Sequence, residues 1–125
     1  MENPNEKKFE VVFYEKTNGR KPVEEFLETL NAKVEAKVIG LLNLLAKEGN
    51  ELREPYSKPI GNDIYELRYQ NKQQPARVLY FFYLDNKIVV TNGFIKKTKK
   101  TPRREINKAM KHMKDYIERH NNDNA

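Results

Sequence analysis

The segments Ile64-Tyr-Glu-Leu-Arg-Tyr69, Ala76-Arg-Val-Leu-Tyr-Phe-Phe-Tyr-Leu84 and Ile88-Val-Val-Thr-Asn-Gly-Phe94 decide the fold. Each segment is rich in aromatic and β-branched residues, and short polar breaks separate the three. This spacing predicts three strands joined as an antiparallel meander. The middle segment is too apolar for an edge strand, so we expect it to lie inside the sheet.

Outside the meander, the patterns predict one more strand and three helices. Phe9–Tyr14 favours a first strand, and Pro22 opens a short helix that runs to Leu30. Asn31 is expected to cap a helix that ends before Gly49, and Thr101-Pro102 is expected to start the last helix. Glu51–Asn62 is expected to be a loop. The predicted fold is α+β, in the order β-α-α-β-β-β-α, with a small, largely antiparallel sheet covered by helices on one face.

Length and composition favour a single domain over residues 1–125, with residues 1–8 and 121–125 frayed. The chain has no cysteine, so it offers neither a disulfide framework nor a thiolate metal site. Its start lacks the features of a signal peptide, and no apolar run approaches the roughly 20 residues of a membrane span. We therefore expect a cytoplasmic protein with no membrane partner.

Positive charge is concentrated in the second half of the chain. Residues 1–63 carry 10 Lys/Arg against 12 Asp/Glu, whereas residues 64–125 carry 14 against 6. The segment that follows the meander contains Lys96, Lys97, Lys99, Lys100, Arg103 and Arg104. A solubilising surface is one interpretation, but a basic cluster next to aromatic residues favours nucleic acid.

Two arginines interrupt the apolar strands. Arg68 ends one strand and Arg77 starts the next, so antiparallel pairing brings them close together. An arginine inside an apolar strand needs an anion, which is either a ligand or an acid such as Glu66. Phe94 is either a core residue or a platform on which an unpaired base stacks. His112 and His120 are expected to be surface residues.

Four motifs in this order resemble a known family. They are Tyr65-Glu-Leu-Arg68, Arg77-Val-Leu-Tyr80, Gly93-Phe-Ile-Lys-Lys-Thr98 followed by Thr101-Pro102, and a terminal helix that begins with Glu105-Ile106 and runs through Ala109. From Phe9 to about Ile117 the chain is similar to the RelE/ParE superfamily of toxins, and within it to the HigB or phage Gp49-like group.

The resemblance implies a RelE-like fold and the toxin of a type II toxin–antitoxin system. Such a toxin is a ribosome-dependent mRNA endoribonuclease that inhibits translation without a metal or other cofactor. The matching positions imply that Arg68, Arg77, Lys96 and Lys97 are catalytic and that Phe94, Lys99, Lys100, Arg103 and Arg104 contact RNA. Arginine suits the charge that develops on the phosphate when the 2′-OH attacks it. A lysine crowded by cations has a lowered pKa and suits proton transfer, and either Lys96 or Lys97 fits this role.

The residues and motifs leave two other classes of function open. One is a ParE-like protein that inhibits DNA gyrase by binding alone, and the other is a plain nucleic-acid-binding module. The resemblance also implies a helix-turn-helix (HigA-like) antitoxin, a heterotetrameric complex with it, and mRNA and the ribosome as further partners. We expect the antitoxin to contact the two N-terminal helices and to leave Arg68, Arg77 and Lys97 largely open.

Overall fold

The computed structural model describes residues 7–123. The elements are β1 (Glu10–Phe13), α1 (Pro22–Glu28), α2 (Ala32–Glu48), the 3-10 turn η1 (Gly49–Glu51), β2 (Ser57–Gly61), β3 (Ile64–Tyr69), β4 (Ala76–Tyr83), β5 (Lys87–Ile95) and α3 (Arg103–Asp123). The strands form one sheet in the spatial order β1-β5-β4-β3-β2. β3, β4 and β5 form the predicted antiparallel meander, and β1 joins β5 in parallel. The α+β class and the largely antiparallel sheet are confirmed.

The prediction of a loop over Glu51–Asn62 is wrong, because this segment contains β2. β2 pairs antiparallel with β3 and forms one edge of the sheet. Pro59 within it has no N–H to donate, and an edge strand tolerates that loss. The strand is short and contains both Pro59 and Gly61, so its sequence resembles that of a loop.

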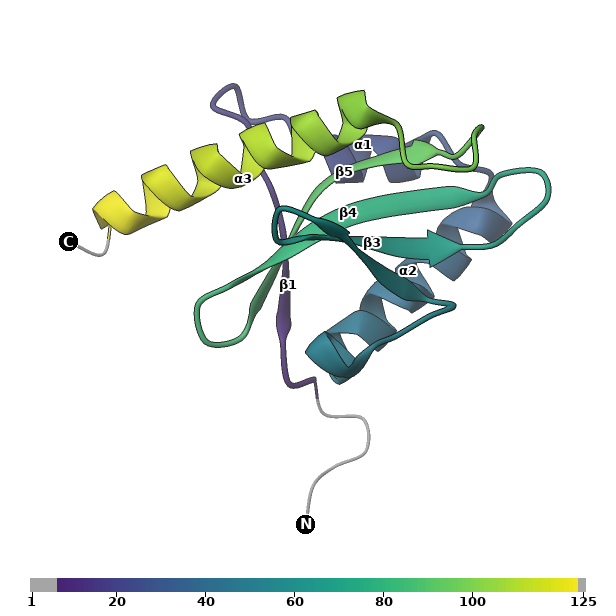
Figure 1. Cartoon of the computed structure of the whole chain (residues 1–125), viewed down its shortest axis with the longest axis horizontal. Helices are drawn as coiled ribbons and strands as arrows, with labels where there is room; N and C mark the ends of the chain where they lie inside the picture. The colour runs from purple at the N-terminus through teal and green to yellow at the C-terminus, as the bar shows by residue number, and fades with distance from the viewer. Residues whose placement is uncertain (1–6, 124–125) are drawn as a thin grey trace, which may run out of the picture.

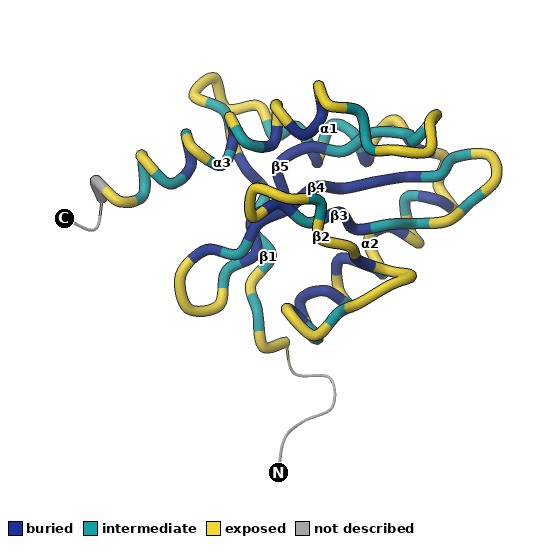
Figure 2. The backbone as a smooth tube through the Cα atoms, viewed as in Figure 1, coloured by how far each residue is buried: buried dark blue, intermediate teal, exposed yellow. Residues whose placement is uncertain are grey.

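The helices cover both faces of the sheet, which corrects the expectation that they cover one. Val78 and Tyr80 of β4 pack in the apolar cluster of α1 and α2, whereas Leu79 and Phe81 pack in the cluster of α3. Figure 1 shows α3 along one side of the sheet and α2 along the other. Because both of its faces are covered, β4 is buried along nearly its whole length (Figure 2). The long apolar stripe of α3 needs its own apolar surface, and the second face of β4 supplies it.

The ends of the helices follow local signals in most places. The Asn31 side chain accepts from the Val34 N–H at 2.9 Å, and Gly49 ends α2 with a φ of 57°. Both caps were predicted. α3 extends to Asp123, so residues 121–123 are helical rather than part of a tail, while residues 1–6 and 124–125 lie outside the described part. No helix within residues 7–123 is long and apolar enough to cross a membrane.

Candidate functional site

A buried carboxylate, Glu66, lies at the centre of the site. Its residue is 1 % exposed, although it belongs to a strand and carries a charge. Glu66 and Arg68 point to the same face of β3, and register pairs Arg68 with Arg77 on β4. One Glu66 oxygen lies 3.5 Å from the Arg68 Nε and 3.7 Å from the Arg77 Nε. The Thr101 hydroxyl donates to the other oxygen. The two predicted arginines are therefore brought together, and they share an acid.

The two terminal nitrogens of the Arg77 guanidinium donate three hydrogen bonds to protein acceptors, whereas its buried Nε has no hydrogen-bond partner among the described residues. Its Nη1 donates to the carbonyls of Tyr69 at 3.1 Å and Ala76 at 2.9 Å, and its Nη2 donates to the Gln70 Oε1 at 3.0 Å. Burial lowers the pKa of Arg77, and the charge of Glu66 opposes this effect. The residue is only 3 % exposed, so Arg77 does not lie on an open face. It ties the ends of β3 and β4 together and holds Glu66 in place.

Arg68 retains access to solvent. About a fifth of its side chain is exposed, at 18 %, and its Nη1 lies 4.0 Å from a carboxylate oxygen of the exposed Glu54. Its backbone N–H donates to the carbonyl of Tyr56 at 2.8 Å, which anchors β3 beside the start of β2. Of the two arginines, Arg68 is the one whose guanidinium can meet a ligand.

Lys96 is a further cation close enough for the charge of Glu66 to affect its pKa, and we call Glu66, Arg68, Arg77 and Lys96 the Glu66 cluster. The backbone N–H of Lys96 donates to the Pro75 carbonyl at 2.9 Å, directly after β5 ends. Desolvation lowers the pKa of Lys96; Glu66 opposes this, and the charges of Arg77, Arg68 and Lys58 lower it further. Lys58 lies opposite Glu66 in the β2–β3 register. Lys97, in contrast, is exposed.

The remaining residues of the predicted site lie outside the Glu66 cluster. Lys99, Lys100 and Arg103 are exposed and form no ion pair with a described residue, and Arg104 lies 3.6 Å from Glu105. Together with Lys97 they form an exposed basic segment, residues 97–104. Phe94 lies opposite Arg77 in the register and is partly buried, because it packs against the α3 cluster while part of the residue stays exposed.

His112 is not a surface residue, which corrects its prediction. It is 7 % exposed, its Nδ1 lies 3.1 Å from the Thr91 carbonyl, and its ring stacks on Tyr14 with centroids 4.4 Å apart. His120 is partly exposed and its Nδ1 lies 2.9 Å from the Tyr116 carbonyl. The apolar stripe of α3 brings His112 beneath the end of β1, a contact between segments far apart in sequence.

Sequence reasoning missed Lys58 and Thr101 and treated Glu66 only as a possible ion-pair partner. The alternation of β3 was a usable signal for Glu66, because residues two apart share one face of a strand. Lys58 had no such signal, since β2 was not predicted. Among residues 7–123, no three His, Cys, Asp or Glu side chains gather in a group that suits a metal ion.

Comparison with known proteins places these features in a family. A family model described as phage-derived Gp49-like protein matches residues 25–114, which include the second half of α1, all of α2 and the four strands β2 to β5, and the first half of α3. The matched part contains Glu66, Arg68, Arg77 and Lys96. No curated protein matches the chain significantly.

Proposed function

The chain belongs to the phage-derived Gp49-like family, part of the RelE/HigB-like toxin group, and on this premise we propose that it is an mRNA endoribonuclease that inhibits translation. The observation that carries the proposal is the buried Glu66 in contact with Arg68 and Arg77, with the half-buried Lys96 and the exposed basic segment next to them in the chain fold. The exposed cations attract a polyanion first. The Glu66 cluster behind them is positive overall, because its three cations outnumber Glu66.

The proposed reaction is attack of a ribose 2′-OH on the adjacent phosphate. The 2′-oxygen forms a bond to phosphorus while the bond from phosphorus to the 5′-oxygen breaks, which leaves a 2′,3′-cyclic phosphate and a 5′-OH. Lys96 in its neutral form accepts the 2′-OH proton and, as an ammonium, returns a proton to the leaving 5′-oxygen. Its lowered pKa raises the fraction that is neutral at physiological pH.

The neighbours of Lys96 have separate roles in this proposal. Arg68 binds the phosphate oxygens, because it keeps solvent access and a planar set of donors. Glu66 and Arg77 position Arg68 and Lys96 rather than touch RNA, since both are buried. The basic segment binds the backbone of the strand on either side of the cleaved bond.

Two adjacent lysines provide a matched test. Lys96→Met should abolish cleavage of an mRNA on translating ribosomes, whereas Lys97→Met should retain cleavage and lose only part of the RNA affinity. Primer extension on the mRNA measures cleavage, and thermal unfolding of both variants verifies that they fold. The same assay with and without ribosomes measures whether cleavage depends on the ribosome.

Several outcomes would overturn the proposal. Equal loss of cleavage in the Lys96 and Lys97 variants would remove the proton-transfer role of Lys96. Intact mRNA together with impaired DNA supercoiling would favour the gyrase-inhibitor alternative. Loss of cleavage on adding EDTA to an assay with intact ribosomes would show that the reaction needs a metal.

The family also implies an antitoxin partner. We propose that this partner is of the helix-turn-helix (HigA-like) type, that it binds the face formed by α1 and α2, and that the complex is a heterotetramer. An apolar groove on that face is lined by Phe13, Leu27 and Leu42, and Glu24, Glu28 and Glu35 line it as well. Such a groove supplies the desolvated anchors that a tightly held partner needs.

A further inference from the structure

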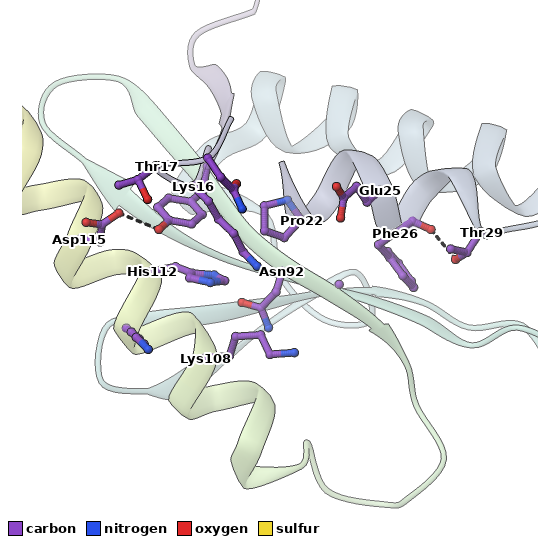
Figure 3. A pocket seen from close by; sticks show the side chains of 14 residues that line it. Lys16, Thr17, Pro22, Glu25, Phe26, Thr29, Asn92, Lys108, His112 and Asp115 are labelled. Atoms are coloured by element: carbon purple, nitrogen blue, oxygen red, sulfur yellow. Dashed lines mark hydrogen bonds between the residues drawn. The ribbon is translucent and has the colours of Figure 1, made fainter. Parts of the chain in front are cut away.

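A second cavity, of about 750 Å³, lies on the opposite flank of α3 from Glu66. It opens between α3, α1, the chain after β1 and the end of β5, as Figure 3 shows. Among the residues of the structure that line this cavity, none is Glu66, Arg68, Arg77 or Lys96. A cavity of this size is within the range of sites that hold small molecules.

Asn92 at the wall of the cavity carries a buried acceptor for which residues 7–123 supply no donor. Asn92 lines the cavity and is 2 % exposed, and its Nδ2 donates to the carbonyl of Glu105 at 3.2 Å and to the Glu105 carboxylate at 3.1 Å. Both partners are acceptors, so they fix the orientation of the amide. The Oδ1 of Asn92 is then left with no donor among the described residues. A ligand that carries an N–H group would supply one.

His112 adds a second acceptor beside Asn92 (Figure 3). Its Nδ1 faces the Thr91 carbonyl at 3.1 Å, and because a carbonyl only accepts, the proton is on Nδ1. Burial lowers the pKa of His112, so the ring is neutral and its Nε2 is an acceptor. No described residue donates to this Nε2.

Cations surround these acceptors, and the nearby acids are already paired. Lys16 and Lys111 line the cavity without an ion pair to any described residue. Glu25 binds Arg20 through both of its oxygens, at 2.8 and 2.9 Å. Asp115 accepts from the Tyr14 hydroxyl at 2.7 Å and lies 2.8 Å from Arg119. The free charge of the cavity is therefore positive.

We propose that this cavity binds a mononucleotide whose base carries an amino group. The amino group donates to Asn92 and His112, the phosphate lies between Lys16 and Lys111, and Phe26 and Pro22 offer apolar surface to the base. Lys108 also lines the cavity, but it lies 3.7 Å from the Glu105 carboxylate and is already paired. This nucleotide is either free in solution or one unit of an RNA strand, since the chemistry of recognition is the same. The proposal stands on its own and does not depend on the cleavage reaction at Glu66.

The test uses NMR and calorimetry on the full chain with AMP, ribose 5-phosphate and inorganic phosphate as probes. AMP should shift the signals of the Asn92 side-chain amide and the His112 ring, and should bind several-fold more tightly than ribose 5-phosphate. Lys111→Glu should weaken AMP binding about tenfold, a loss of about 1.4 kcal/mol. Lys114→Glu is the matched control, because Lys114 is exposed on the same helix and does not line the cavity.

The other possible results either overturn the proposal or identify the source of the nucleotide. Equal affinity for AMP, ribose 5-phosphate and phosphate overturns it, because the base then contributes nothing. AMP binding that Lys96→Met removes and Lys111→Glu leaves intact also overturns it, because the nucleotide then lies at the Glu66 cluster. Shifts of Asn92 and His112 with a short ribo-oligonucleotide and weakening by Lys111→Glu, without AMP binding, assign the cavity to a unit of RNA. Shifts with AMP alone assign it to a free nucleotide.

Discussion

At the scale of single residues, we expect Arg77 to stabilise the fold although it belongs to a charged site, because it is buried and bonded to the ends of two strands. Arg77→Met leaves Glu66 without one of its cations and two strand-end carbonyls without their donor. Breaking a buried pair in this way costs about 3–5 kcal/mol, so we expect the free energy of unfolding to fall by that amount. Urea denaturation measures it, with the exposed Arg53→Met as a control that changes stability by less than about 0.5 kcal/mol. An unchanged midpoint with lost activity would instead make Arg77 a ligand-binding residue.

We expect His112 to make the stability of the protein depend on pH near neutrality. Burial lowers its pKa in the folded state; the bond to the Thr91 carbonyl opposes this, Lys16 and Lys108 lower the pKa further, and Asp115 raises it. The unfolded chain therefore binds a proton near pH 6.5 that the folded chain does not. Stability should fall as the pH drops below about 6.5, with a slope of at most about 1.4 kcal/mol per pH unit.

A pair of histidine variants isolates this effect. His112→Asn keeps an N–H donor for the Thr91 carbonyl and removes the titration, so it should flatten the decline between pH 7 and 5. His120→Asn, on the same helix, should leave the decline in place. Denaturant unfolding at several pH values measures both slopes. A decline that survives in His112→Asn would assign the titration to another group.

At the scale of elements, two glycines have opposite roles. Gly40 is exposed inside α2 and a Cβ there would meet nothing within 4 Å, whereas a Cβ on Gly93 would lie 2.3 Å from the Phe26 ring. Gly40→Ala should therefore raise the free energy of unfolding by about 1 kcal/mol. Gly93→Ala should lower it by about 2 kcal/mol, because α1 must move away from β5. Thermal unfolding shows whether each variant is more or less stable than the original chain. Stabilisation by Gly93→Ala would show that α1 moves at little cost.

At the scale of the whole molecule, the sheet separates two working surfaces. The face of α1 and α2 holds the apolar groove, and the opposite face holds the Glu66 cluster and the basic segment. In a complex with the antitoxin, we expect Lys7, which lines the groove, to be protected from an amine-modifying reagent. Lys97 and Lys99 should stay reactive. Mass spectrometry of the modified chain measures both, and the reverse pattern would place the antitoxin on the basic segment.

The sequence by itself determined the features that depend on short-range signals. Runs of aromatic and β-branched residues separated by short polar breaks predicted the antiparallel β3–β4–β5 meander. Asn31 and Gly49 predicted both ends of α2, because a cap bonds to groups within one turn of itself. The pairing of Arg68 with Arg77 also followed, since antiparallel strands joined by a short connection place the residues nearest that connection opposite each other.

Only the tertiary structure decided which surfaces meet. An apolar stripe shows that a helix is buried on one side, but which face of the sheet it covers depends on the path of the chain and the surface left free by the other helices. Hence α3 packed opposite α1 and α2, and His112 became buried against Tyr14. Lys96 and Lys97 are adjacent residues of the same type, and the sequence does not distinguish them. In the structure, the backbone N–H of Lys96 donates to the Pro75 carbonyl, Lys96 is half-buried near Glu66, and Lys97 is exposed. Long-range packing sets such differences in desolvation, and on them rests the proposal that two neighbouring, chemically identical side chains have different roles.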